Sequence, residues 1–290
     1  MIHVKTKEEI LAMREGGKIL ARILHALAKE VKPGVTTGYL ENLAYKLITE
    51  AGGKPAFKGY KSGAGGRGFP TAICASINHE VVHAPALPPR VLEEGDLIGI
   101  DIGMEYPAFV PPAGGTTAGK PAMSGAVKNF PKNRYSASGG FITDMALTAG
   151  AGEIGEERRK LLEVTKKALE LGIAEVKPGK RLSDIGRAIE NYVKKNGFSV
   201  VRALVGHGVG YEVHEEPQIP NYLAKEKDFK DVVLRPGMVI AIEPMVNAGE
   251  HDVESDADGF TIVTSDGSMS AHFEHTVAVT DRGHEILTLE

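Results

Sequence analysis

The feature that most constrains the fold of this 290-residue chain is an internal repeat. Residues 31–34 have the sequence Val-Lys-Pro-Gly, and the same four residues recur at 176–179, an offset of 145. A second pair, 92–101 and 234–243, follows in the same order with an offset of 142. Each member of that pair runs from a turn into an apolar strand that ends in a carboxylate. Two repeats in one order indicate a duplication, although helix–Pro-Gly–helix connectors also occur without one.

Helical patterns flank both Val-Lys-Pro-Gly segments. Thr6 and Glu9 have the spacing of a capping box in front of the first helix, and Gly52 and Gly197 stand where C-terminal caps are expected. Combined with apolar strands, these helices predict an α/β or α+β fold with two related halves, whose acidic strand ends meet at the axis between them. Helices are expected over residues 10–28, 39–51, 156–171 and 182–196.

Composition excludes several classes of protein. Lys and Arg (34) nearly balance Asp and Glu (38), and the absence of a basic block argues against nucleic-acid binding. The single cysteine, Cys74, excludes an intramolecular disulfide framework and fits a reducing compartment. The chain has no apolar run of 18 residues and no signal-peptide core after Met1. We therefore expect a cytoplasmic protein that does not span a membrane.

One segment interrupts the repeated pattern. Residues 104–139 are rich in Pro, Gly, Ala and Ser and carry little periodicity, which is typical of a long surface loop or an insertion. The composition does not distinguish a functional lid from a poorly ordered segment.

Residues 63–68 fit the G-x-G-x-x-G pattern of dinucleotide-binding loops. That pattern requires a strand before it and a helix after it. Here Pro70 and the apolar run that follows it favour an extended segment instead. A flexible loop is therefore the favoured interpretation.

Residues 79–83, His-Glu-Val-Val-His, match the H-E-x-x-H zinc signature. The two histidines of that signature bind one metal because they share the face of a helix. The β-branched Val81 and Val82, and the prolines at 85, 88 and 89, favour extended structure. On a strand, His79 and His83 would share one face and could line a cleft. A zinc endopeptidase stays as an alternative.

A scattered set of four carboxylates and one imidazole is the third candidate site. Each carboxylate lies in an apolar stretch, where burying it is costly unless it is paired, protonated or bound to a cation. Two divalent ions about 3.5–4 Å apart, bridged by carboxylates, would neutralise the set and activate a water molecule. The candidate ligands are Asp101, Asp144, His207, Glu243 and Glu274.

These residues and their surroundings resemble the type I methionine aminopeptidases, which have the pita-bread fold. The resemblance runs from Lys5 to about Leu287, outside the loop at 104–139. It implies one catalytic domain over 1–290, with halves of about 1–150 and 151–290 around a central curved antiparallel sheet flanked by helices. Its most specific motifs are Ser-Ile-Asn at 76–78 leading to His83, Gly-His-Gly-Val-Gly at 206–210, His-Glu-Glu-Pro at 214–217, Ile-Glu-Pro-Met-Val-Asn at 242–247 and Glu-His-Thr at 274–276.

The resemblance implies two divalent metal ions, which could be cobalt, manganese, iron or zinc. By this carry-over, Asp144 and Glu274 bridge the ions, Asp101 binds one, and His207 and Glu243 bind the other. Asp101 and Asp144 are 43 residues apart, whereas the family usually joins them by a short hairpin. A long loop costs little extra entropy, so the ligands can still converge.

The resemblance also assigns roles around the substrate. His83 would contact it near the scissile bond, His214 would hold the scissile carbonyl, and Glu243 would accept a proton from the bridging water. An apolar pocket for the methionine side chain would be lined by Phe69, Cys74 and Phe260. Gly66 and Val213 stand where the family usually has aromatic residues, which predicts a wider pocket.

The implied function is removal of the initiator methionine from nascent proteins by a cytoplasmic monomer with transient ribosome contact. One alternative is an Xaa-Pro peptidase of the same fold, although such enzymes usually carry a substantial extra N-terminal domain and only 82 residues precede His83 here. Another is a non-catalytic pita-bread binding protein, although such proteins lose metal ligands and all five are present here.

Overall fold

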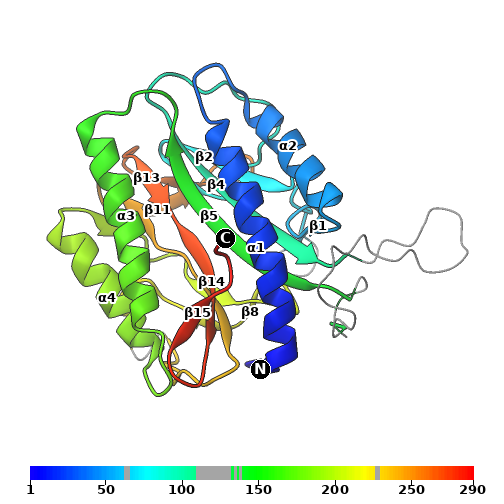
Figure 1. Cartoon of the computed structure of the whole chain (residues 1–290). Coiled ribbons are helices and arrows are strands. Elements are labelled where there is room, and N and C mark those ends of the chain that lie inside the picture. The colour runs from blue at the N-terminus through cyan, green and yellow to red at the C-terminus, as the bar shows by residue number, and fades with distance from the viewer. Residues whose placement is uncertain (62–65, 109–131, 134–135, 137–138, 226–228) are drawn as a thin grey trace, which may run out of the picture.

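The computed structural model of the protein describes residues 1–61, 66–108, 132–133, 136, 139–225 and 229–290. Four helices in these ranges lie over one side of a curved sheet, two from each half of the sequence (Figure 1). They are α1 (Lys7–Lys29), α2 (Thr37–Glu50), α3 (Glu156–Ala174) and α4 (Leu182–Lys195).

The strands of the described residues form one large sheet and two small ones, and every pair of strands is antiparallel. The strands are β1 (Lys54–Pro55), β2 (Ile73–Ile77), β3 (Glu80–Val82), β4 (Leu97–Tyr106), β5 (Phe141–Gly150), β6 (Ser199–Val200), β7 (Gly206–Gly208), β8 (Glu215–Ile219), β9 (Val239–Ile242), β10 (Met245–Asn247), β11 (Val253–Ser255), β12 (Ile262–Thr264), β13 (Ser270–His272), β14 (Glu274–Val279) and β15 (His284–Ile286).

The large sheet has the order β1-β4-β5-β14-β9-β7-β8, with β2 added beside β4 and β15 beside β14. Its first strands come from the N-terminal half of the chain, and the rest come from the C-terminal half. The two halves therefore meet where β5 pairs with β14. The small sheets are β13-β10-β6 and β11-β12-β3.

The repeats found in the sequence occupy equivalent places in the two halves. An isolated bridge joins Thr36 to Val91, and another joins Arg181 to Val233. The partners differ by 145 and 142 positions, the same offsets as the sequence repeats. This confirms two pseudo-symmetric halves. The matching backbone hydrogen bonds run from Gly34 N to Leu92 O (2.8 Å) and from Gly179 N to Leu234 O (3.0 Å).

Helix ends agree with the local sequence signals. Thr6 accepts the Glu9 N–H while the Glu9 carboxylate accepts the Thr6 N–H, so the capping box is confirmed. Gly52 and Gly197 follow α2 and α4 with φ of 80° and 85°, a conformation that glycine adopts without steric cost.

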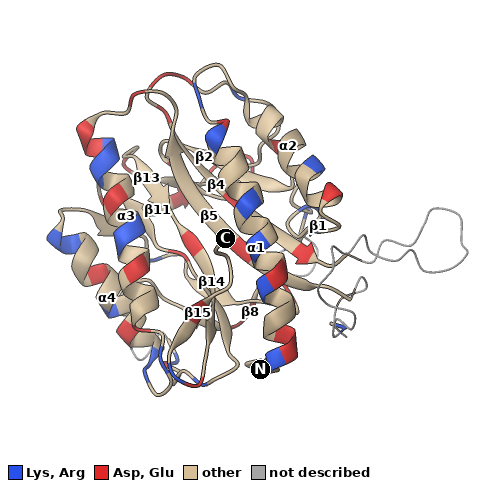
Figure 2. Ribbon diagram, in the orientation of Figure 1, with Lys and Arg blue, Asp and Glu red and all other residues tan. Residues whose placement is uncertain are grey.

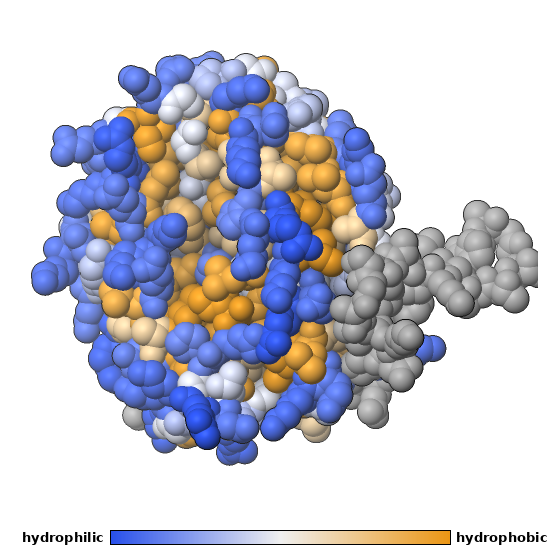
Figure 3. Space-filling model, in the orientation of Figure 1, coloured by the Kyte–Doolittle hydropathy of each residue, from blue (hydrophilic) through white to orange (hydrophobic). Residues whose placement is uncertain are grey.

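The helices are held by their apolar faces. Leu20, Leu24 and Leu40 of α1 and α2 are fully buried, and each such leucine stabilises the fold by about 1.5–3 kcal/mol. Charged residues lie on the outer surfaces of α1, α3 and α4 (Figure 2), and the same face of the molecule carries hydrophilic residues in the space-filling view (Figure 3). None of the described helices combines the length and apolar content needed to cross a bilayer.

Two strand predictions need correction. Asp101 does not end its strand, because β4 continues to Tyr106 and pairs with β5 residue by residue as far as Phe141. Met104 also lies in β4, so the insertion predicted at 104–139 begins at least three residues later. Most of that segment, 109–131 with 134–135 and 137–138, lies outside the described residues.

Candidate metal and substrate site

Five neighbouring strands of the large sheet bring the predicted ligands together. In sheet order, β4 carries Asp101, β5 carries Asp144, β14 begins at Glu274, β9 leads into Glu243, and β7 carries His207. Their side chains line one cavity of about 500 Å³. All of the predicted site residues line this cavity; besides the ligands they are Phe69, Cys74, His83, His214 and Phe260.

The ligand atoms are close enough to share cations. Oxygens of Asp144 and Glu274 and a nitrogen of His207 all lie within 4.8 Å of one another. His207 Nε2 is 3.4 Å from Glu243 Oε1 and 4.0 Å from Asp144 Oδ2, and burial, followed by the charge of Asp101, raises the pKa of Asp144. The five side chains therefore form one continuous group.

Burial makes this group energetically unfavourable without cations. It raises the pKa of Asp101 to about 7. Burial, followed by the charges of neighbouring carboxylates, raises the pKa values of Asp144, Glu243 and Glu274 well above their usual range. Four carboxylates this close cannot all ionise unless positive charge is supplied.

The histidine in the group has its metal-binding nitrogen free. His207 Nδ1 is 2.9 Å from the Gly208 carbonyl oxygen, which can only accept, so Nδ1 carries the proton. Burial lowers the pKa of His207 to about 4. The neutral ring therefore presents the Nε2 lone pair to the carboxylates, as a metal ligand does.

The described residues fit divalent metal binding. Asp101 Oδ1 and Glu274 Oε1 are buried and have no hydrogen-bond donor. Such acceptors are costly to bury, and a cation satisfies them. Carboxylates with one imidazole are a donor set that Mn, Fe, Co and Zn accept.

Two histidines flank this group. His83 follows β3 with a left-handed backbone, φ 62°, and burial lowers the pKa of its side chain. The His214 ring lies 4.4 Å from the His207 ring, centroid to centroid. His214 is exposed to solvent in the cavity, and partial desolvation, followed by the charges of His207 and His83, lowers its pKa. Both flanking rings are therefore neutral near pH 7.

Aromatic rings form the apolar side of the cavity. Phe69 and Phe260 meet edge to face at 5.5 Å between centroids, and Cys74 is buried beside them. Gly66 lines the cavity and adds no side chain to it. Val213 is buried in the cluster that includes these rings.

Two residues near the ligands went unnoticed in the sequence. Tyr60 lines the cavity, and its hydroxyl is 2.7 Å from His214 Nδ1. His272 is buried, with Nε2 at 4.0 Å from carboxylate oxygens of both Glu243 and Glu274. The position of His272, two residues before the ligand Glu274, could have indicated that His272 lies near the site. No local sequence signal marks Tyr60, because its hydrogen-bond partner His214 lies 154 residues away.

The competing motifs are not arranged for their usual chemistry. The H-E-x-x-H segment forms a turn and strand β3, not a helix, as predicted. Within G-x-G-x-x-G, residues 63–65 lie outside the described part, and residues 66–70 form neither helix nor strand.

Comparison with known proteins identifies the family. The profile of metallopeptidase family M24 matches residues 11–118 and 134–281. The chain belongs to metallopeptidase family M24. It is 43% identical to methionine aminopeptidase 1 of Bacillus subtilis over 289 residues, 99% of each chain, and 42% identical to the methionine aminopeptidase of Clostridium acetobutylicum. The crystal structure of methionine aminopeptidase from Thermotoga maritima superposes with a TM-score of 0.83 at 40% identity, covering all of both chains.

These matches confirm the resemblance to type I methionine aminopeptidases and the pita-bread fold within family M24. Prolidase from Pyrococcus furiosus is also similar, with a TM-score of 0.66 at 22% identity. The chain covers 65% of that prolidase, and a likeness at this identity concerns the fold alone.

Proposed function

We propose that this member of family M24 is a metal-dependent methionyl aminopeptidase that removes the N-terminal methionine from nascent proteins and peptides. The observation that carries the proposal is one cavity with a buried carboxylate–imidazole group beside an aromatic wall. The chain matches these relatives along nearly their full length, and they are named methionine aminopeptidases, which supports the same activity.

Asp101, Asp144, His207, Glu243 and Glu274 would hold two divalent ions of cobalt, manganese, iron or zinc. When bound, such ions polarise the scissile carbonyl and lower the pKa of a coordinated water molecule. Glu243 would take up the proton that the attacking water loses.

His214 would donate a hydrogen bond to the scissile carbonyl oxygen. We assign the Tyr60 hydroxyl as the donor to His214 Nδ1, which leaves the proton of the neutral ring on Nε2. Burial raises the pKa of Tyr60, so its hydroxyl keeps this proton. A preorganised donor of this kind contributes about 2.7–4 kcal/mol to transition-state stabilisation.

The remaining residues select and orient the substrate. Phe69 and Phe260 offer ring edges and faces that suit a flexible thioether, with the Cys74 sulfur beside them. His83 would contact the peptide near the scissile bond. In this proposal the protein acts on nascent chains in the cytoplasm, as a monomer in transient contact with the ribosome.

The test is a metal reconstitution assay. The protein is stripped of metal, Mn²⁺ or Co²⁺ is added back, and free methionine is measured from Met-Ala-Ser beside Ala-Pro-Ser and an internally cleavable peptide. Metal-dependent release of methionine alone is expected. Cleavage of Ala-Pro-Ser would assign an Xaa-Pro peptidase, internal cleavage a zinc endopeptidase, and inactivity with every metal a binding protein.

Replacing Tyr60 with phenylalanine is expected to lower kcat about 3- to 10-fold, because one hydrogen bond is worth about 0.5–1.5 kcal/mol. KM should change little, since His214 acts on charge that develops in the transition state. Steady-state kinetics on Met-Ala-Ser give both constants. Tyr45→Phe, on the exposed surface of α2, is the matched control and should be silent. An unchanged kcat for Tyr60→Phe would remove Tyr60 from the mechanism.

Metal binding is expected to release protons and to tighten as pH rises from 6 to 8. The pKa of Asp101 is about 7 in the metal-free protein, so below pH 7 a proton must leave before the carboxylate binds. Each displaced proton changes the apparent Kd by up to about tenfold per pH unit. Titration calorimetry with Mn²⁺ in buffers of different ionisation enthalpy counts these protons. The Asp101→Asn variant should release fewer protons on binding Mn²⁺. A Kd that does not change with pH would contradict the expectation.

A further inference from the structure

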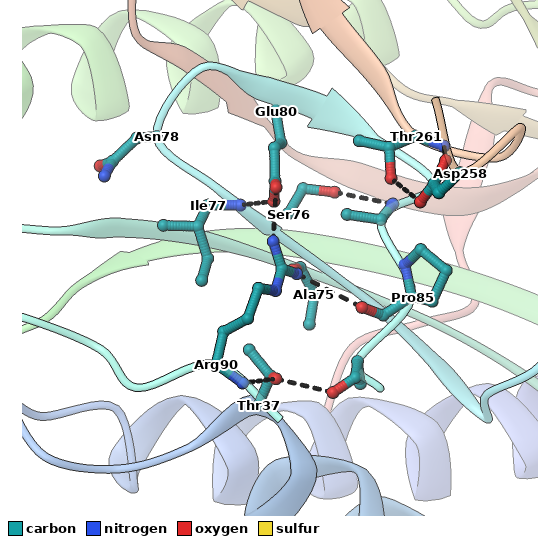
Figure 4. A network of polar contacts seen from close by, with 12 residues as sticks. Thr37, Ala75, Ser76, Ile77, Asn78, Glu80, Pro85, Arg90, Asp258 and Thr261 are labelled. Atoms are coloured by element: carbon teal, nitrogen blue, oxygen red, sulfur yellow. Dashed lines mark hydrogen bonds and ion pairs between the residues drawn. The ribbon is translucent and has the colours of Figure 1, made fainter. Parts of the chain in front are cut away.

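The glutamate of the H-E-x-x-H segment lies in a polar network next to the cavity (Figure 4). The Glu80 carboxylate accepts the Ile77 N–H at 2.6 Å and forms an ion pair with the Arg90 guanidinium. Neither Glu80 nor Arg90 is among the residues that line the catalytic cavity, and both line an adjacent cavity of about 440 Å³. This pair can therefore affect the site only through the chain that it holds.

The guanidinium binds the backbone on both sides of the segment that carries His83. Arg90 Nη2 donates to the carbonyl oxygens of Ala75 at 2.6 Å and Pro85 at 3.3 Å. Ala75 follows the pocket residue Cys74 in β2, and Pro85 is two residues after His83. Figure 4 shows Arg90 directed at Glu80, Ala75 and Pro85 together. One side chain thus joins β2, β3 and the segment after His83.

His83 has a conformation that needs such support. A non-glycine residue in the left-handed region is strained and persists only where the surroundings fix it. The ladder nearby is short: Cys74 forms an isolated bridge with Pro85, and Ala75 N–H donates to Ala84 O at 2.8 Å. Arg90 is the side chain that ties these backbone segments to β3.

We propose that Arg90, held by Glu80, is a positioning residue that fixes His83 and Cys74 in the cavity wall. Its planar guanidinium serves one carboxylate and two carbonyls at once, which a lysine ammonium cannot reproduce with the same geometry. The kinetic part of this proposal rests on the proposed function. A displacement of about 1 Å at a catalytic group can cost on the order of 100-fold in rate.

The single cysteine makes the proposal testable without activity. Cys74 lines the cavity but is only 4% exposed, so loosening of the wall around it should raise the rate at which a thiol reagent labels it. Arg90→Met is expected to raise the rate of Cys74 labelling at least tenfold over the wild-type protein. The matched control is Arg14→Met, because Arg14 pairs with Glu285 between α1 and β15 and its side chain is 32% exposed, against 33% for Arg90.

Kinetics on metal-loaded protein provide the second measurement. Arg90→Met is expected to lower kcat 10- to 100-fold on Met-Ala-Ser while KM stays within threefold, and metal content should not change. The kcat of Arg90→Lys should lie between those of Arg90→Met and the wild-type protein. Glu80→Gln should lower kcat only a few-fold. A zinc endopeptidase would instead lose all activity on Glu80→Gln.

The outcomes separate this proposal from the proposed function. If Arg90→Met and Arg90→Lys both keep kcat within twofold of wild type, or label Cys74 no faster than Arg14→Met does, the positioning role is wrong. If Arg90→Met does not fold, the kcat values and Cys74 labelling rates of Arg90→Lys and Glu80→Gln are compared with those of the wild-type and Arg14→Met proteins instead. If wild-type protein releases no methionine, the proposed function fails, while the labelling rates still decide whether Arg90 holds the wall.

Discussion

Exchanging Asp144 for asparagine is expected to lower metal-dependent methionine release by on the order of 10³-fold or more. Changes to residues that only support ligands typically cost about 10–100-fold, and Asp144 lies within the ligand group itself, next to His207 and Glu274. Asparagine keeps the shape and removes the charge that two cations require. The measurement is methionine release from Met-Ala-Ser at saturating Mn²⁺, with bound metal determined on the same sample.

The same substitution is expected to stabilise the metal-free protein, increasingly as pH rises from 5 to 8. Burial, then the charge of Asp101, raises the pKa of Asp144 well above its usual value. A carboxyl group whose pKa is higher in the folded than in the unfolded protein stabilises the fold while it is protonated. This stability is complete below the pKa of the unfolded state and is lost as pH rises through the pKa of the folded state. Asparagine does not titrate, so the variant does not lose this stability. The difference in Tm between Asp144→Asn and the wild-type protein, both metal-free, should therefore increase with pH.

The control is Asp184→Asn on α4, where the carboxylate pairs with Arg187 at the surface. It should leave methionine release and metal content unchanged. An Asp144→Asn protein that keeps more than a tenth of wild-type activity would show that the ligand assignment is wrong. Loss of activity without loss of metal would instead limit Asp144 to a role in the reaction itself.

Local signals in this sequence were sufficient for the helices and for the repeat. The capping box at Thr6 and the glycines after α2 and α4 act within a few residues, so their outcome does not depend on the rest of the fold. The ligand residues stood out because a carboxylate within an apolar strand is costly unless its surroundings compensate it. The resemblance supplied the roles that this argument could not.

Features set by distant contacts were missed. The extension of β4 past Asp101 depends on pairing with β5 across a long insertion, and nothing in residues 102–106 alone fixes its length. The hydrogen bond between Tyr60 and His214 joins residues 154 positions apart. The Arg90–Glu80 pair was hidden for another reason: Glu80 fitted a zinc motif, and only the strand geometry of β3 shows what its carboxylate binds.

Replacing His214 with alanine is expected to lower kcat about 10²- to 10³-fold, the loss that follows removal of one preorganised donor to a developing oxyanion. KM should stay within about threefold, because the ground-state carbonyl accepts a weaker hydrogen bond. Because the pKa of His214 is lowered from its usual value, the ring is neutral at pH 7 and above, and its removal should scale the pH–rate profile down there without moving its alkaline limb. Steady-state kinetics from pH 5.5 to 9 measure both effects.

His214→Gln separates a donor role from a packing role, because glutamine retains an N–H donor of similar reach. It should recover part of the rate that alanine loses, whereas a space-filling substitution by leucine should not. His25→Ala is the surface control, since His25 pairs with Glu290 away from the cavity. If the whole effect of His214→Ala appears in KM, or if bound metal falls in parallel with kcat, then His214 binds substrate or supports His207 rather than stabilising the transition state. The 4.4 Å between the His214 and His207 rings makes metal content the measurement that decides between these roles.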